Sequence, residues 1–227
     1  MKKYELVGEF EFYGKKFFQI KALISFGTVF VGELGGYIEK EENLNQYDNA
    51  WVSGNARVSG NARVSGNAWV YDNAWVSDNA RVSGTAWVSG NARVSGNARV
   101  CGNARVSGNA WVSGNAWVYD NAWVSGNAWV YDNASVSGNA RVSGNAWVSG
   151  DADVMWISKI GSRSATLTIF KTKDGFKLAT GCFLGTFEEF KNAVASKKED
   201  DKHRKEYESL YGFIELRFGN KQNDKVI

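Results

Sequence analysis

Tryptophan and arginine alternate at one position of a short repeat in the middle of the chain. In SGNARVSGNARVSGNAWVYDNAWVSD, residues 53–78, this position holds Arg57, Arg63, Trp69 and Trp75, always between Ala and Val. Indole rings stack on planar groups, and guanidinium groups bind phosphate through paired hydrogen bonds. The two side chains also attract each other when the cation lies over the ring. The repeat therefore predicts either recognition of a planar, anionic ligand or contacts among these side chains alone.

One Trp and one Arg supply too little free energy for tight binding. Stacking of a base contributes about 1–3 kcal/mol, and a charge-assisted hydrogen bond contributes about 1.5–3 kcal/mol. Micromolar binding requires about 8 kcal/mol. We therefore expect a tight site to be composite, with contributions from neighbouring chains or from residues outside the repeat.

The repeat has the form N-A-[WR]-V-[SY]-[GD] and runs from Asn49 to Gly150, which is 102 residues, or 17 hexads, without an insertion. On an extended segment Ala and Val lie two residues apart and face the same side, whereas their neighbours face the other side. Gly-Asn and Asp-Asn tolerate the positive φ of a sharp corner. Each hexad is therefore predicted to be a short strand and a bend, with Ala and Val inward and the variable residues outward.

Such strands cannot bury an apolar face alone, so the hexads must coil and stack. VSGNAW and VSGNAR match the motif aliphatic-small-x-x-small-x, and the pattern resembles the hexapeptide-repeat family of left-handed parallel β-helices over about 45% of the chain. The resemblance implies three hexads per triangular turn and nearly six turns. With about 4.8 Å between stacked strands the prism is expected to be roughly 27 Å tall. Many members of the family are trimers, so the resemblance also implies a homotrimer.

The remaining residues are expected to cover the open sheet edges at the two ends of the coil. The entry segment, 22–52, resembles the N-terminal cap of hexapeptide-repeat proteins from bacterial genomes and prophages. After the coils, SATLTIFKT-KDG-FKLATGCF predicts a hairpin, and Thr186-Phe187-Glu188-Glu189 is a capping box that starts a helix through about Ser196. A charged run, KKEDDKHRK, leads to an amphipathic helix near Tyr207 to Phe218.

The predicted fold is therefore mainly β, a left-handed parallel β-helix with an N-terminal β cap and a small C-terminal α+β (ββαα) module. The expected domains are residues 1–48, 49–156 and 157–227. The string GSR…GCFLGTFEEF in the last of these resembles C-terminal modules of phage and prophage proteins.

Every third hexad is expected on the same face of the prism, so that nine of the ten tryptophans point outward. An exposed aromatic surface of this extent is unusual for a monomer. The tryptophans of face two, Trp75, Trp111, Trp129 and Trp147, are therefore the predicted oligomer interface. Face one carries Trp51, Trp69, Trp87, Arg105, Trp123 and Arg141; face two carries Arg57, Trp75, Arg93, Trp111, Trp129 and Trp147; face three carries Arg63, Arg81, Arg99, Trp117, Ser135 and Asp153.

Two sets of residues are candidates for binding a nucleotide-like ligand. Face three has the only uninterrupted run of arginines, followed by a tryptophan, which suits phosphate and base respectively. In the C-terminal module a helix N-terminus attracts anions, although a turn and an N-cap explain the same residues without a ligand. The candidate ligand-binding residues are Arg63, Arg81, Arg99 and Trp117 on the coil, and Ser162, Arg163 and Thr186 in the C-terminal module.

Catalysis, a metal site and a cofactor are not expected. The acyltransferases of the hexapeptide-repeat family use a histidine base in or beside the coils, and the related carbonic anhydrases use three histidines to bind metal. This chain has one histidine, His203, inside the charged run. Cys101 replaces a Ser at an outward position, but no base can be assigned to it. The four Asp of the coils replace Gly at corners.

Composition limits the partners and the compartment. The net charge of +3 does not demand a long nucleic acid. Cys101 and Cys182 lie too far apart in sequence for a CxxC motif, and no disulfide framework is expected, which fits a reducing cytoplasm. The start MKKYELVGEFEFYGKK lacks the apolar core of a signal peptide, and no apolar run approaches the roughly 20 residues of a membrane span. These features predict a cytoplasmic protein, in a bacterial host cell if it is phage-encoded.

The sequence therefore predicts a non-catalytic, phage- or prophage-derived protein that sequesters a small nucleotide-like signal of host defence. The alternative is a purely structural or protein-interaction scaffold. A degenerate acyltransferase is a second alternative, but it needs a base that this chain lacks. Ice binding is disfavoured because the faces carry Trp and Arg where ordered Thr ladders are expected.

Overall fold

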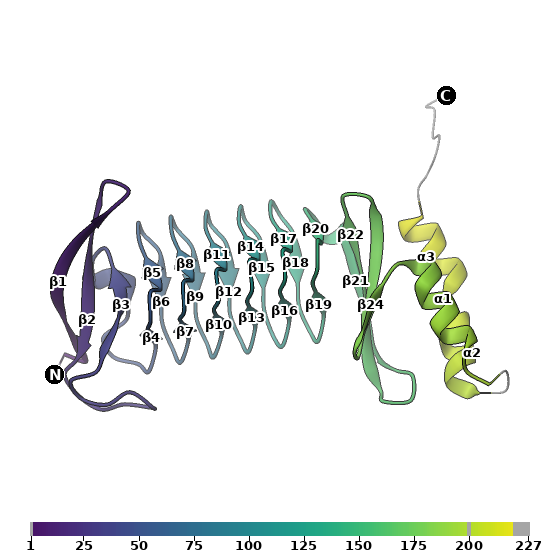
Figure 1. Cartoon of the computed structure of the whole chain (residues 1–227), viewed down its shortest axis with the longest axis horizontal. Coiled ribbons are helices and arrows are strands. Elements are labelled where there is room, and N and C mark those ends of the chain that lie inside the picture. The colour runs from purple at the N-terminus through teal and green to yellow at the C-terminus, as the bar shows by residue number, and fades with distance from the viewer. Residues whose placement is uncertain (1, 199–200, 220–227) are drawn as a thin grey trace, which may run out of the picture.

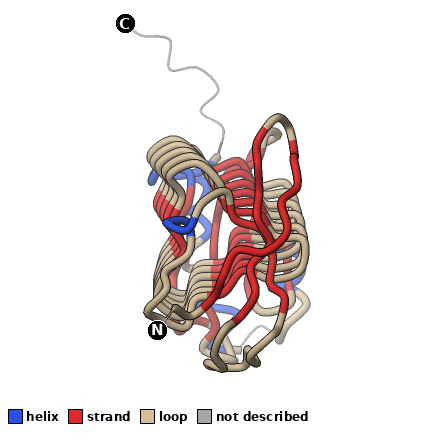
Figure 2. Tube along the Cα trace, turned by 90° about the vertical axis from the view of Figure 1, so that its left-hand side faces the viewer, coloured by secondary structure: helices blue, strands red, loops and turns tan. Residues whose placement is uncertain are grey.

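The computed structural model describes residues 2–198 and 201–219. Its centre is a parallel β-solenoid whose coils follow one another along the long axis of the molecule (Figure 1). Each hexad contributes one two-residue strand, and every third strand pairs in parallel with the next on the same face. The three faces contain six, six and five coil strands, which makes about six turns. Seen from the N-terminal end, successive turns superpose (Figure 2).

Except for Asp153, the three faces contain the residues that the hexad spacing predicts. Face one consists of β4 (Trp51–Val52), β7 (Trp69–Val70), β10 (Trp87–Val88), β13 (Arg105–Val106), β16 (Trp123–Val124) and β19 (Arg141–Val142). Face two consists of β5 (Arg57–Val58), β8 (Trp75–Val76), β11 (Arg93–Val94), β14 (Trp111–Val112), β17 (Trp129–Val130) and β20 (Trp147–Val148). Face three consists of β6 (Arg63–Val64), β9 (Arg81–Val82), β12 (Arg99–Val100), β15 (Trp117–Val118) and β18 (Ser135–Val136).

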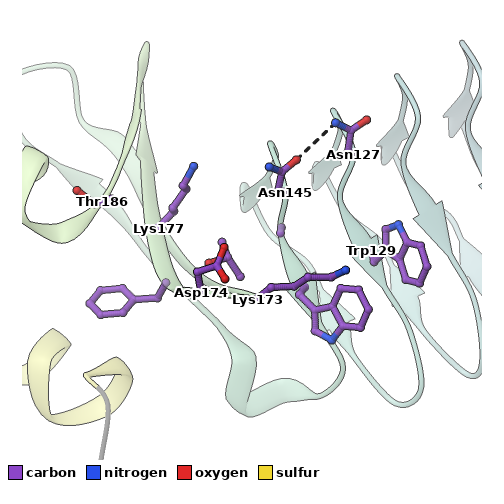
Figure 3. Close-up of a pocket in the computed structure, with 11 residues that line it drawn as sticks. Asn127, Trp129, Asn145, Lys173, Asp174, Lys177 and Thr186 are labelled. Atoms are coloured by element: carbon purple, nitrogen blue, oxygen red, sulfur yellow. Dashed lines mark hydrogen bonds between the residues drawn. The ribbon is translucent and has the colours of Figure 1, made fainter.

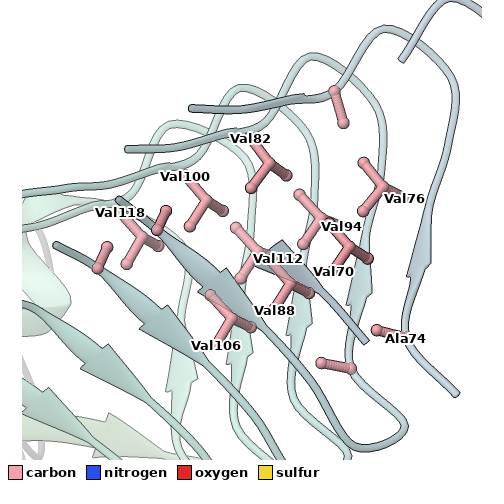
Figure 4. Packing of buried hydrophobic residues seen from close by; sticks show 14 of the residues in the cluster. Val70, Ala74, Val76, Val82, Val88, Val94, Val100, Val106, Val112 and Val118 are labelled. Atoms are coloured by element: carbon pink, nitrogen blue, oxygen red, sulfur yellow. The ribbon is translucent and has the colours of Figure 1, made fainter. Parts of the chain in front are cut away.

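The interior of the coil is filled by the alanines and valines of the repeat. Every one of them from Ala50 to Val148 is at most 1% exposed. The valines of the three faces point toward one another and form columns along the axis (Figure 4). The prediction that Ala and Val face inward is confirmed, and the apolar burial it produces is the main source of stability for the solenoid.

The corners are joined from coil to coil by the Gly, Asp and Asn of the repeat. At Gly102, φ is +67° and a Cβ atom would lie 2.9 Å from the backbone nitrogen of Asp120, so the stack leaves no room for a side chain. Asp120 itself has φ of 57° and accepts a hydrogen bond from the backbone N–H of Gly138 at 3.2 Å. An Asp at the Gly position of a corner therefore adds a hydrogen bond to the next coil. Exposed Asn side chains form a parallel ladder, as from Asn91 to Asn109 at 3.0 Å.

The N-terminal strands extend face two and cover the first coil. β1 (Tyr4–Phe12) and β2 (Lys15–Ala22) form an antiparallel hairpin, and β3 (Leu34–Ile38) pairs with β2 and, in parallel, with β5. A 3-10 turn, η1 (Glu41–Asn43), follows β3. The side chains that close the core here are Tyr4, Ile20, Ala22, Val29, Ile38 and Leu44.

The burial of Trp51 corrects the prediction that nine tryptophans point outward to solvent. Its side chain is 0% exposed because Tyr4 and Phe26 cover it, with ring centroids at 6.4 and 5.4 Å. Beside it the ammonium of Lys3 donates to the carbonyl oxygens of Asp48 and Ala50 at 3.0 and 2.8 Å. Burial lowers the pKa of Lys3, although the carboxylate of Asp48 opposes that shift.

The C-terminal module has more elements than the predicted ββαα order. After η2 (Asp151–Asp153), four antiparallel strands follow in spatial order β21 (Val154–Ile160), β22 (Ala165–Thr172), β23 (Gly175–Thr180) and β24 (Phe183–Gly185). The predicted hairpin is β22–β23, and the predicted capped helix is α1 (Phe187–Ala195). The expected helix near Tyr207 to Phe218 is divided into α2 (Lys202–Glu208) and α3 (Tyr211–Phe218). Residues 199 and 200 of the charged run and residues 220–227 lie outside the described residues.

A second hydrophobic core lies between the C-terminal sheet and the three helices. Ile214 and Phe218 of α3 are buried with Leu167 and Leu178 of the sheet, while Tyr207 of α2 packs against Phe190 of α1 at 5.3 Å. Tyr211 of α3 also packs against Phe190, at 6.4 Å, so both helices contact α1.

Asp153 joins this module to the last coil. The prediction that it lies on face three is wrong, because it belongs to η2. Its Oδ2 accepts hydrogen bonds from the N–H and hydroxyl of Ser149 at 2.9 and 2.7 Å, and its Oδ1 lies 2.6 Å from the ammonium of Lys171. Burial acts to raise the pKa of Asp153, but the hydrogen bonds from Lys171 and Ser149 outweigh it and lower that pKa. The carboxylate of Asp153 thus links the turn after β20 to β22 of the C-terminal sheet.

Candidate functional site

Residues at the fifth position of the hexad contact tryptophans of the following coil on all three faces. The indole N–H of Trp75 donates to the hydroxyl of Ser59 at 3.1 Å, and Trp123 donates to Ser107 at 3.2 Å. Where this position is Tyr, the contact is between rings, as for Tyr131 and Trp147 at 5.4 Å. These tryptophan rings are therefore held against the preceding coil by partners that the repeat itself supplies.

The arginines of faces one and two lie over aromatic rings. Arg105 lies 5.0 Å from the centroid of Trp87, and Arg141 lies 4.7 Å from that of Trp123. On face two, Arg93 lies 6.0 Å from Trp75. Arg57 lies 4.1 Å from Phe12 in the β1–β2 hairpin. These arginines each have a cation–π partner on the preceding coil or cap, so their positions need no ligand.

Face three differs because three arginines follow one another on adjacent strands. We call Arg63, Arg81 and Arg99 the arginine column; they are direct neighbours in the parallel register, and all three are exposed. In the part of the chain that the structure describes, no ring or carboxylate contacts Arg63 or Arg81 within cation–π or ion-pair distance. Like charges directly opposite on neighbouring strands are unfavourable. Within the described residues no ion pair balances the charge of Arg63 or Arg81, although Glu41 and Glu42 line the same hollow as Arg63.

Trp117 closes the column at its C-terminal side, as predicted. Its ring centroid lies 6.0 Å from the guanidinium of Arg99, and its indole N–H donates to the Sγ of Cys101 at 3.2 Å. The side chain stays 43% exposed. At the other end Arg63 lines a hollow with Glu41 and Tyr47. The four predicted coil residues thus form one continuous strip, with a ring at one end.

The candidates in the C-terminal module do not form one site. Thr186 caps α1, where its hydroxyl accepts from the N–H of Glu189 at 3.3 Å and its own N–H donates to Oε2 of Glu189 at 2.7 Å. That hydrogen bond from the Thr186 backbone lowers the pKa of Glu189, so the helix N-terminus already holds a carboxylate. Ser162 and Arg163 are exposed in the turn before β22. Ser162 and Thr186 line different hollows, and Arg163 lines neither.

A hollow at the junction of coil and C-terminal module was missed from the sequence. We call it the end hollow; it has a volume of about 430 Å³ and lies between the last coils of face two and the β22–β23 turn (Figure 3). Lys173 and Lys177 carry its positive charge and Asp174 its negative charge. The motif KDG indicates only a hairpin turn, so nothing in the sequence places these lysines beside tryptophans. The lining residues are Asn127, Trp129, Asn145, Ala146, Trp147, Thr172, Lys173, Asp174, Phe176, Lys177 and Thr186.

The predicted oligomer interface is divided by the fold. Trp75 stacks under Tyr13 of the β1–β2 hairpin, at 6.4 Å and 4° between planes. Trp111, Trp129 and Trp147 instead form a row on successive coils, with centroids 4.9 Å apart in both pairs, and the last pair is stacked at 15°. This tryptophan row leads into the end hollow.

The single histidine lies in the C-terminal module. Nδ1 of His203 is 3.3 Å from Oε2 of Glu206, which also accepts from the N–H of Gly161. The backbone hydrogen bond from Gly161, followed by that from His203, lowers the pKa of Glu206. Within residues 2–198 and 201–219 no three side chains of His, Cys, Asp or Glu form a group that could hold a metal ion.

The coils are similar to one described repeat family. The YdcK Beta solenoid repeat model matches residues 50–64, 56–72, 62–77, 74–90, 86–102, 98–114 and 134–150. All these matches fall in the coils, and they agree with the parallel β-solenoid of the structure. No curated protein matches the chain. Among the described residues, no helix has the length and apolar character needed to cross a membrane.

Proposed function

We propose that this protein is a non-catalytic binding protein that holds a small nucleotide-like anion on the arginine column. The proposal rests on a contrast between arginines. Those of faces one and two lie over aromatic rings. In the described part of the chain, Arg63 and Arg81 form neither a cation–π contact nor an ion pair. An anion bound along the column relieves the repulsion between these guanidinium groups.

The chemistry of the column suits a ligand with both phosphate and base. Guanidinium groups form paired hydrogen bonds with phosphate oxygens, and Trp117 offers an exposed ring for stacking. Two or three such contacts at about 1.5–3 kcal/mol each, with one stacked base at about 1–3 kcal/mol, approach the roughly 8 kcal/mol of micromolar binding. The C-terminal resemblance to phage proteins extends the proposal to a nucleotide signal of host defence, sequestered in the cytoplasm of a bacterial cell.

Native mass spectrometry of the protein purified from cells that make candidate nucleotides tests this function. We expect a bound small molecule with the wild type and its loss in the double variant Arg81→Gln/Arg99→Gln. The control Arg93→Gln/Arg105→Gln removes the same charge from ring-paired positions and should retain the ligand. If no nucleotide co-purifies, and cyclic nucleotides do not bind at tens of micromolar in calorimetry, the binding function is wrong.

The finer features of the fold belong to the same proposal. We propose a left-handed coil of the hexapeptide-repeat type and a homotrimer in which Trp111 and Trp129 lie between chains, while Trp147 faces the end hollow. Sedimentation velocity should then give three times the 25.0 kDa chain mass. Trp111→Glu with Trp129→Glu should weaken assembly, because it places charge in an apolar contact. A stable monomer at micromolar concentration contradicts the trimer.

A structural scaffold is the second candidate function. It is favoured by the internal contacts of faces one and two, where indole N–H groups and guanidinium groups find partners within the chain. A scaffold function does not explain why three arginines lie next to one another on face three. We therefore prefer ligand binding.

A further inference from the structure

The end hollow combines an aromatic platform with a cation already in contact with it. Trp147 stacks on Trp129 at 4.9 Å, and the ammonium of Lys173 lies 4.6 Å from the Trp147 ring centroid. The lysine comes from the turn between β22 and β23, so coil and C-terminal module each supply one half of the contact (Figure 3). A site at this place would be composite, with contributions from the repeat and from residues outside it.

The last asparagine of the corner ladder adds an unused donor. Asn127 donates through Nδ2 to Oδ1 of Asn145 at 3.4 Å. The three asparagines before it, Asn91, Asn109 and Asn127, each donate through Nδ2 to the Asn of the next coil, but the repeat ends after Asn145. In the described part of the chain Nδ2 of Asn145 has no acceptor, and it lines the hollow (Figure 3).

The charge of the hollow is positive. Lys173 and Lys177 line it against one acid, Asp174, and neither lysine forms an ion pair within residues 2–198 and 201–219. Lys177 also contributes to the lowered pKa of the carboxyl of Glu189, whose main partner is the backbone of Thr186. Glu189 therefore offsets part of the charge of Lys177, whereas among the described residues Lys173 has the ring of Trp147 as its one partner.

We propose that the end hollow is a second ligand site, which takes a small aromatic anion: a planar ring that carries one phosphate or carboxylate. The ring packs against Trp147 and displaces the ammonium of Lys173, which then pairs with the anionic group. Lys177 and Nδ2 of Asn145 supply further donors to that group. Hollows of about 300–1,000 Å³ with aromatic walls and few polar groups are typical of small-molecule sites. This site is separate from the arginine column and does not depend on the function proposed for it.

Calorimetry with the full chain tests the site. The probes are adenosine monophosphate and 2-naphthoate, which carry both ring and anion, and adenosine and inorganic phosphate, which each lack one of them. We expect the first two to bind and the last two to bind at least tenfold more weakly. Loss of one charge-assisted contact in Lys173→Met should weaken binding of the first two probes about tenfold or more.

Matched variants separate this site from the arginine column and from unfolding. Lys205→Met removes an exposed lysine of α2, and Arg81→Gln alters the column; both should leave the affinity for 2-naphthoate unchanged. Trp147→Leu should weaken both ring-bearing probes, and the thermal unfolding of Lys173→Met should match that of the wild type. An effect of Lys173→Met on adenosine monophosphate alone assigns the anion as phosphate. Equal binding of adenosine and its monophosphate, or full affinity in Lys173→Met, overturns the proposal.

Discussion

Faces one and three of the solenoid have the same backbone and different surfaces. Their strands stack in the same parallel register, with Val88 opposite Val106 on face one and Val82 opposite Val100 on face three. On face one Arg105 lies over a tryptophan, whereas on face three Arg81 lies between two other arginines. Because the scaffold is constant, the fold does not require this accumulation of charge. The difference between the two faces lies in their outward side chains alone, and it motivates the binding function that we propose for face three.

The largest expected effect tests whether the two faces share one scaffold. Val100→Asp on face three and Val106→Asp on face one each bury a charge without a partner at a 0% exposed position. Each is expected to cost about 3–5 kcal/mol of the free energy of unfolding, to a similar extent. Urea unfolding followed by circular dichroism measures this cost. Clearly unequal losses contradict the equivalence of the faces.

A substitution at the junction of the last coil and the C-terminal module should lower stability without affecting the faces of the solenoid. Asp153→Asn removes the ion pair with Lys171 and weakens the bonds from Ser149, at an expected cost of about 1.5–3 kcal/mol. Binding at the arginine column should not change.

The same carboxylate predicts a dependence of stability on pH. The folded pKa of Asp153 is lowered, so its contribution is present above the unfolded value of about 3.9 and is lost as the pH falls through the folded value. The gap in stability between wild type and Asp153→Asn should therefore close in strong acid. Unfolding midpoints from pH 7 to below pH 3 check this, and a gap that persists there contradicts the role given to the ion pair.

The smallest expected effect is on stability: replacing an arginine should change the free energy of unfolding with opposite sign on the two faces. Arg105→Gln removes a cation from over Trp87 and should destabilise the chain by about 0.5–1 kcal/mol. Arg81→Gln removes a like-charged neighbour and should be neutral or stabilise the chain by a few tenths of a kcal/mol. Thermal unfolding at low salt shows both effects best, since salt screens them. Equal destabilisation by the two variants indicates that the column has internal partners.

The coils could be predicted from the sequence because each position of the hexad has one structural role: it packs inward, faces outward or forms the corner. The inward Ala and Val, the corners and the membership of the three faces all follow from a period of six. The burial of Trp51 could not be predicted in this way, because Tyr4 and Phe26 that cover it come from a segment without periodicity.

The ends of the solenoid account for the other differences. The spacing of the repeat predicts Asp153 on face three, but its carboxylate forms a hydrogen bond with Ser149 and an ion pair with Lys171. The end hollow depends on where the β22–β23 turn docks on the last coils, and contacts between a repeat and a non-repeating module leave no pattern in the sequence. The arginine column was predictable because it is a property of the repeat itself.

Calorimetric titration of adenosine diphosphate at two salt concentrations tests the central claim about the arginine column most directly. Three proteins are compared: the wild type, Arg81→Gln/Arg99→Gln, and the control Arg93→Gln/Arg105→Gln. We predict that the affinity of the wild type falls with rising salt, because exposed charge pairs are screened. The column variant should bind at least ten- to a hundredfold more weakly, and the control should bind as the wild type does. Equal affinity of the column variant and the control contradicts the account.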